Sequence, residues 1–219
     1  AGWAVILSIL ALAASVYGVI RYFFASSELT GRSFWVTALA GMATVSIVRG
    51  EGEAALIWST VLLLFGTFQS LHSYRLPGQW WLMLPGFVGL SGLPFTPGSQ
   101  GWEGLLVLPF NALDIGFLFV FIWLLLGYLK HAFRPDEPSD AVELWMKVLY
   151  PFGFLLLVGV QWFTGASFLT VTLNTGTWWA SVVAVVAALG VAYLVNRWVP
   201  AIFSPGPTAS GVRRRERSA

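Results

Sequence analysis

The chain has 219 residues, of which 57% are hydrophobic and only 10% are charged, with a formal net charge of +2. Because ordinary globular domains carry roughly 25% charged residues, a soluble fold is excluded and an integral membrane protein is predicted. The absence of cysteine excludes disulfides, thiolate metal sites and covalently attached c-type haem. The sequence holds no metal-ligand motif, catalytic motif or basic nucleic-acid-binding face, so we expect neither a metal site, an enzyme nor a nucleic-acid partner.

Seven stretches are apolar enough to predict transmembrane helices, which need roughly 17–25 mostly apolar residues. The predicted fold is an all-α bundle of about seven transmembrane helices in a single domain over residues 1–199. In chain order the predicted spans are residues 3–24, 33–48, 53–72, 79–95, 104–129, 144–164 and 177–198.

The basic residues predict which way the chain crosses the membrane, since Lys and Arg near span ends gather on the cytoplasmic side. If the N-terminus lies outside, Arg49 is the single basic residue on the outer side. We therefore expect an N-out, C-in protein of a prokaryotic inner membrane. The other basic residues then all lie inside: Arg21, Arg32, Arg75, Lys130, Arg134, Lys147, Arg197, Arg213, Arg214, Arg215 and Arg217.

Residues 200–219 form a predicted cytoplasmic tail with three prolines and a basic run, a composition that cannot build a packed core. Its Arg213, Arg214, Arg215 and Arg217 are candidates for contact with anionic lipid, at about 1 kcal/mol per basic residue near the surface. A docking segment for a partner subunit is the alternative.

Tryptophan residues lie near most predicted span ends. At this level of the membrane an indole ring is half buried in lipid and its N–H bonds to water. Trp35 and Trp102 belong to this group. Trp58 and Trp123 lie deeper in their spans. We interpret these two as packing or lipid contacts, with a pigment or quinone contact as the alternative.

Asp114 is the clearest candidate for a functional site, because ionisable groups inside a membrane are rare and tend to be functional. It lies about ten residues into the fifth predicted span, roughly 15 Å deep. Asn111 lies three residues earlier, and Pro109 leaves the carbonyl of Leu105 without a helical donor. A carboxyl group at that depth stays protonated unless a cation pairs with it. A proton-carrying site and a polar contact that joins helices are both consistent with this pattern.

The remaining polar candidates lie near predicted span ends. His72 and His131 are the only histidines, and Gln69 shares a helix face with His72. Since the two histidines do not lie at matched depth within two helices, they do not predict a haem site. Glu103 lies at the outer surface, and Glu53 is positioned to pair with Arg49 at i,i+4.

Two consecutive segments resemble the antiporter-like, proton-pumping subunits of respiratory complex I and of Mrp-type cation/proton antiporters. The first is GEAALIWSTVLLLFGTFQSLHSYR, and the second contains SGLPFTPG at residues 91–98. The second segment is similar to the LAGLPPTAGF element of that family, and the resemblance covers about residues 35–130. It implies a proton-transport or electron-transport setting, but the family's proton relay does not carry over. Where the family has its lysine this chain has Trp58, Ser59 and Thr60, and the later Lys or Glu corresponds to Trp102 or Glu103.

Three functions are compatible with these features. The first is a non-catalytic subunit of an energy-converting membrane complex, mainly structural, with a candidate protonatable site at Asp114. Such a subunit contacts lipids and other membrane subunits, and small residues of the second span such as Ala38, Gly41 and Thr44 predict close helix packing. The alternatives are an autonomous proton-coupled ion or solute transporter and a pigment- or quinone-associated scaffold.

Overall fold

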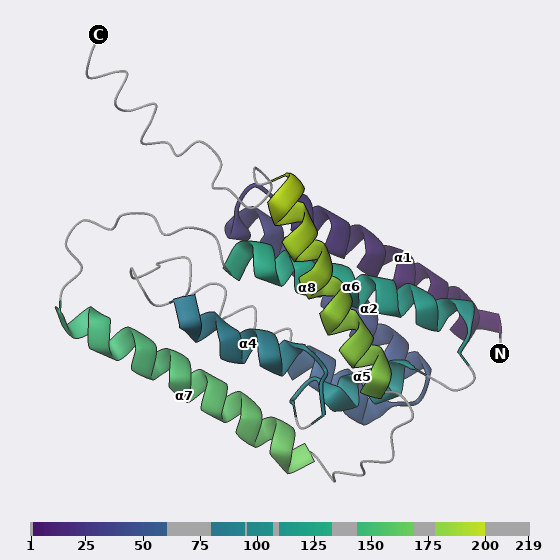
Figure 1. Ribbon diagram of the computed structural model, residues 1–219. Helices are drawn as coiled ribbons and strands as arrows, with labels where there is room; N and C mark the ends of the chain where they lie inside the picture. The colour runs from purple at the N-terminus through teal and green to yellow at the C-terminus, as the bar shows by residue number, and fades with distance from the viewer. Residues whose placement is uncertain are drawn as a thin grey trace.

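The computed structural model describes residues 2–60, 80–94, 96–106, 110–132, 144–168 and 178–199, and all regular secondary structure within them is helical. Long helices pack side by side, and α7 lies to one side of them, next to α4 (Figure 1). A further helical stretch covers residues 52–60. The elements are α1 (Gly2–Phe24), α2 (Glu28–Val48), η1 (Trp80–Leu82), α4 (Met83–Leu90), α5 (Ser99–Leu105), α6 (Ala112–Ala132), α7 (Leu144–Phe168) and α8 (Trp178–Trp198).

Four of the described helices are long and apolar enough to cross a membrane, so the chain has the character of a membrane protein. They are Gly2–Phe24, Thr30–Val48, Ala112–Ala132 and Trp179–Trp198. The first, second and seventh predicted spans agree closely with α1, α2 and α8, and the sixth agrees with α7. Of the third predicted span, residues 52–60 are helical and the rest lies outside the described residues.

The fourth and fifth predicted spans have different limits in the structure. The continuous helix expected over residues 79–95 is instead η1 followed by α4, which ends at Leu90 because Gly92 takes a left-handed conformation at φ +64°. The helix expected over residues 104–129 is also broken. Leu106 is extended, and α6 begins only at Ala112.

Small residues bring α1 and α2 into close contact, as the sequence predicts for Ala38 and Gly41. A Cβ atom at Gly18 would lie 2.7 Å from the carbonyl oxygen of Phe34 and 2.8 Å from the backbone nitrogen of Ala38. The Ser15 hydroxyl donates to the Ala38 carbonyl at 2.9 Å. Thr44, the third residue predicted for this face, is exposed and donates instead to Ala40 of its own helix.

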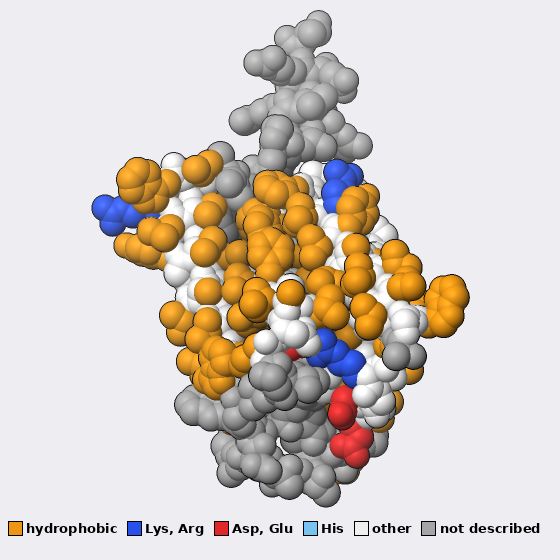
Figure 2. All heavy atoms as spheres, turned by 90° about the vertical axis from the view of Figure 1, so that its right-hand side faces the viewer, with side chains coloured by type: hydrophobic (Ala, Val, Ile, Leu, Met, Phe, Trp, Pro, Cys, Tyr) orange, Lys and Arg blue, Asp and Glu red, His pale blue; other side chains and the backbone are white. Residues whose placement is uncertain are grey.

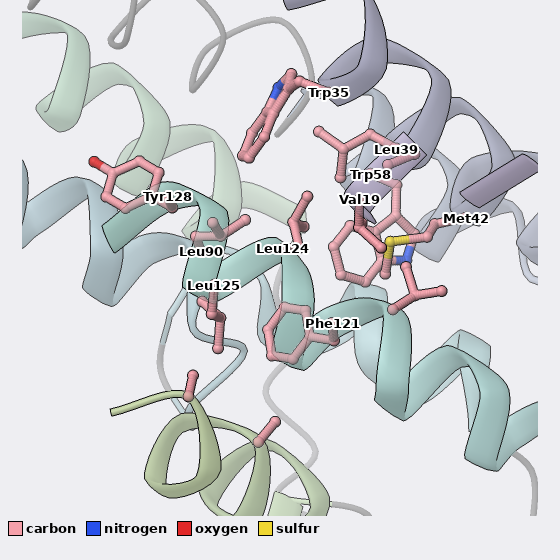
Figure 3. Packing of buried hydrophobic residues seen from close by; sticks show 14 of the residues in the cluster. Val19, Trp35, Leu39, Met42, Trp58, Leu90, Phe121, Leu124, Leu125 and Tyr128 are labelled. Atoms are coloured by element: carbon pink, nitrogen blue, oxygen red, sulfur yellow. The ribbon is translucent and has the colours of Figure 1, made fainter. Parts of the chain in front are cut away.

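Helix α6 forms the centre of the core, whereas α1 and α8 lie at its margin. Over an apolar stretch of 18 residues in each helix, 56% of the α6 stretch is buried inside the protein. The corresponding shares are only 28% for α1 and 22% for α8. Figure 3 shows side chains of several helices meeting around α6. The labelled residues are Val19, Trp35, Leu39, Met42, Trp58, Leu90, Phe121, Leu124, Leu125 and Tyr128.

The two ends of the bundle differ in charge. At one end, the Lys130 ammonium donates to the Phe23 carbonyl at 2.6 Å, so α1 and α6 run in the same direction. At the other end, the rings of Phe110 and Trp179 are 5.2 Å apart, so α8 starts where α6 starts. We call the first end the basic end; its described residues include Arg21, Arg32, Lys130, His131 and Arg197.

Hydrophobic side chains cover the middle of the face shown in Figure 2. Lysine or arginine side chains lie at the upper edge of this face, and near its lower edge a further basic group lies beside the acidic side chains. A wide apolar band between charged edges is the pattern expected of a surface that faces lipid.

Candidate functional site

The site begins with the turn that ends α2. The N–H of Gly50 donates to Ile47 and that of Glu51 to Ser46, each at 2.9 Å, which is the hydrogen-bond pattern of a Schellman motif. Gly50 adopts φ +85°, a conformation that glycine enters without steric cost. This turn fixes Arg49 as the C-cap of α2 and directs the chain straight into the helix over residues 52–60.

On the opposing segment, Asn111 and Asp114 cap the start of α6. The Asn111 side chain accepts hydrogen bonds from the N–H groups of Leu113 (2.9 Å) and Asp114 (3.1 Å). In return, the Asp114 carboxylate accepts from the Asn111 N–H at 3.0 Å. This reciprocal arrangement is a capping box, and an acidic group in the first turn also interacts favourably with the helix dipole.

Arg49 joins the two segments. Its Nη1 atom donates to Asp114 Oδ1 at 2.8 Å and to the carbonyl oxygen of Leu105 at the end of α5. The Asp114 side chain is fully buried and that of Arg49 is 14% exposed. The guanidinium carbon also lies 5.9 Å from the centre of the Phe117 ring, within the range of a cation–π contact. We call Arg49, Leu105, Asn111 and Asp114 the clamp, and their end of the bundle the clamp end.

The third partner in the clamp, α5, is held by the helix over residues 52–60. The Trp58 indole N–H donates to the Gly101 carbonyl at 2.8 Å. A Cβ atom at Gly101 would lie 2.8 Å from the Trp58 ring, so only glycine permits this approach. A Cβ atom at Gly104 would likewise collide with Ala54 Cβ and lie 2.9 Å from Glu51 Cβ. These contacts place the Leu105 carbonyl beside Arg49.

The position of Asp114 differs from the one expected. It is not ten residues inside a long span: since α6 begins at Ala112, Asp114 is the third residue of the helix and lies in its first turn. Its charge has a cation beside it, and each of its oxygens accepts a hydrogen bond. Of the two roles considered for Asp114, the geometry agrees better with a polar contact that joins helices.

Arg49 is the member of the site that sequence reasoning assigned elsewhere. The sequence allows a modest surface pair with Glu53, four residues later, if that helix begins early. In the structure the ion pair of Arg49 is with Asp114, 65 residues away. The sequence did hold a signal, because Arg49 is the single basic residue predicted for the outer side. The sequence also offered Glu53 and Glu103 on that side, so it did not specify Asp114 as the partner.

Of the other sequence candidates, His131 is described, and it lies away from the clamp. It is at the basic end, where its Nε2 is 2.9 Å from the Tyr22 carbonyl oxygen. Since a carbonyl only accepts, Nε2 is the donor. Glu103 belongs to α5, but its side chain lies outside the described residues, as do His72, Gln69 and the tail residues Arg213, Arg214, Arg215 and Arg217. Within the described residues, no group of three His, Asp or Glu could hold a metal ion.

Two tryptophans that were predicted at the membrane–water interface are buried in the core instead. Trp35 and Trp102, expected at the wet interface, are each 1% exposed, because α2 and α5 turn them into the core. Trp58 is fully buried and packs edge-on against Phe121 and Trp102. Trp123 packs against Phe23. Both of the deeper tryptophans therefore have packing partners within the protein.

Comparisons of the chain with known protein families, with curated proteins and with solved structures found no match.

Proposed function

We propose that the chain is a non-catalytic, mainly structural subunit of an energy-converting membrane complex in a prokaryotic inner membrane. In this proposal it crosses the membrane seven times, with its N-terminus outside and its C-terminus in the cytoplasm. The resemblance of residues 35–130 to antiporter-like subunits suggests the kind of complex.

The structural role is supported mainly by the contacts of Asp114, which is the one buried carboxyl group among the described residues. A group that carries protons must be free to exchange them, and ionisable residues on such paths line cavities or form relays. Asp114 instead holds a 2.8 Å ion pair and caps its own helix. This arrangement favours a fixed contact that joins α2, α5 and α6.

The outward faces of α1 and α8 are apolar, as a membrane subunit requires. Large apolar side chains are exposed along both helices, including Leu10 at 61% and Val186 at 64%. Lipid covers such faces, and within a complex so do neighbouring subunits. The described core contains no second buried ion pair that would suggest a transport path.

The orientation is supported by the charges at the bundle ends. Arg21, Arg32, Lys130 and Arg197 belong to the basic end, whereas Arg49 at the clamp end is paired with Asp114. Under the positive-inside rule, the basic end faces the cytoplasm.

Purification from native membranes tests the subunit role. The chain, tagged after residue 219, is extracted in mild detergent and its native mass and composition are measured by mass spectrometry. We expect a defined complex in which other membrane subunits are present in stoichiometric amounts, together with a redox or ion-translocating component. A homogeneous protein at the mass of this chain alone, or of copies of it, would contradict the proposal.

A further inference from the structure

The turn between α4 and α5 is closed by its own hydroxyl groups. Ser91 Oγ donates to the Val88 carbonyl at 2.6 Å, and Thr96 Oγ1 donates to the Leu93 carbonyl at 2.7 Å. The N–H of Gly98 donates back to the Gly89 carbonyl at 3.1 Å. These bonds fold residues 91–94 and 96–98 into a largely buried corner, where both hydroxyl groups have hydrogen-bond partners.

Two side-chain atoms beside this corner are exceptions. Trp102 Nε1 on α5 and Ser181 Oγ on α8 are buried and have no hydrogen-bond partner, although both residues lie in the part of the chain that the structure describes. Each residue is 1% exposed, so bulk solvent does not reach it. Leaving a buried polar group unpaired costs about 1–3 kcal/mol, and such groups in native proteins are normally satisfied by protein or by ordered water.

Both atoms lie around the same point. A Cβ atom placed at Gly92 would lie in contact with Trp102 Nε1 and 3.2 Å from Ser181 Oγ. Both atoms are thus within one hydrogen-bond length of that position. Their separation cannot exceed the span of one bridging water, whose hydrogen bonds are each roughly 2.7–3.2 Å long.

We propose that Trp102 and Ser181 bind a single ordered water molecule, which bridges α5 and α8 beside Gly92. The indole N–H donates to the water oxygen, and the water donates to Ser181 Oγ. A larger ligand does not fit on the glycine side, because the indole ring already occupies the space that a methyl group at Gly92 would fill. Two polar partners are enough for a buried water.

This site supplies a polar link at a seam that is otherwise apolar. Ser181 shares its face of α8 with Ala180, Ala184 and Ala188, which are buried at 1% exposure or less. Trp102 packs its ring 4.1 Å from that of Phe121 on α6. The water therefore fixes the position of α8 relative to the turn, which small apolar side chains alone do not specify.

Water-edited solid-state NMR of the full chain in lipid bilayers, with ¹⁵N-labelled tryptophan, tests the site. The Trp102 indole signal is identified by its loss in Trp102→Phe or, if that variant does not fold, by elimination after the other indole signals have been assigned through their own Trp→Phe variants. We expect magnetisation from water protons to reach the Trp102 indole N–H several-fold faster than it reaches that of Trp58. In Ser181→Ala the Trp102 indole shift should change.

Trp58 is the matched control, since it is equally buried but donates directly to the Gly101 carbonyl. Three results would overturn the proposal. The first is equal, slow transfer at the two indoles. The second is a shift in Ser181→Ala without water transfer, which would mean a direct contact between Trp102 and Ser181. The third is transfer from lipid protons in place of water, which would mean that a lipid carbonyl occupies the site.

Discussion

Arg49 and Asp114 lie 65 residues apart in the chain, yet Arg49 Nη1 is 2.8 Å from Asp114 Oδ1 and the carboxylate is fully buried. Arg49 is the C-cap of α2 and Asp114 lies in the first turn of α6, so the pair joins the ends of two antiparallel helices. Its energetic role is best seen by removing each charge alone and then both together.

Removal of one partner of the clamp should destabilise the protein strongly. We expect Arg49→Met or Asp114→Asn alone to lower the free energy of unfolding by about 3 kcal/mol, because each leaves an uncompensated charge in a buried place. The double variant should lose less than the sum of the two, since neither charge remains. Unfolding in detergent, followed by circular dichroism, measures all three.

The matched control is the ion pair between Glu28 and Arg32 at the basic end, where the arginine side chain is 40% exposed. Its removal by Arg32→Gln should change stability by no more than about 0.5 kcal/mol, as for other exposed i,i+4 pairs. Equal effects at the two pairs, or strictly additive effects of Arg49→Met and Asp114→Asn, would contradict the clamp.

The turn after α2 should be sensitive to a side chain at Gly50 for conformational reasons alone. Gly50 has φ +85° and open space around its α-carbon. We expect Gly50→Ala to cost about 1 kcal/mol, because a Cβ atom disfavours the left-handed conformation. Gly52→Ala is the control, since Gly52 is helical and equally open. It should be neutral or stabilising. A loss of similar size in both variants would argue against this explanation.

The contact between α1 and α2 should fail when a methyl group is added at Gly18. The new atom would meet the backbone of α2, which cannot rotate away, so the helices must separate. We expect Gly18→Ala to lower stability by about 1–3 kcal/mol. Gly190→Ala on α8, where nothing lies within 4 Å, should leave the unfolding midpoint unchanged or raise it. An unchanged midpoint in Gly18→Ala would mean that the two helices do not pack as closely as described.

The proposed orientation can be tested by labelling single introduced cysteines, because the chain has no cysteine of its own that would react. Cells that carry Gly52→Cys at the clamp end or Ser26→Cys at the basic end are treated with a membrane-impermeant maleimide. The cysteine at position 52 should react in intact cells. That at position 26 should react only after the inner membrane is permeabilised. The reverse pattern would invert the proposed topology, and labelling of both in intact cells would show that the two ends do not lie on opposite sides.

The sequence by itself determined the membrane character, the helical class, the limits of α1 and α8 and the end of α2, because these depend on local apolar runs. It missed the start of α2, which lies at Glu28, five residues before the predicted span. The start of α6 was also readable, since Asn111 followed by Asp114 has the spacing of a capping box, although the apolar run through Leu105–Leu108 concealed it. Small residues such as Ala38 and Gly41 likewise marked a close helix contact in advance.

Only the tertiary structure decided which groups meet. The pairing of Arg49 with Asp114, the burial of Trp102 against Gly92 and the approach of Ser181 all join segments far apart in the chain. Local patterns fix which residues are helical, but they leave the relative rotation and depth of the helices open. Packing fixes both, because the buried Asp114 carboxylate needs a cation beside it, and only one arrangement of the neighbouring helices brings Arg49 within hydrogen-bond distance.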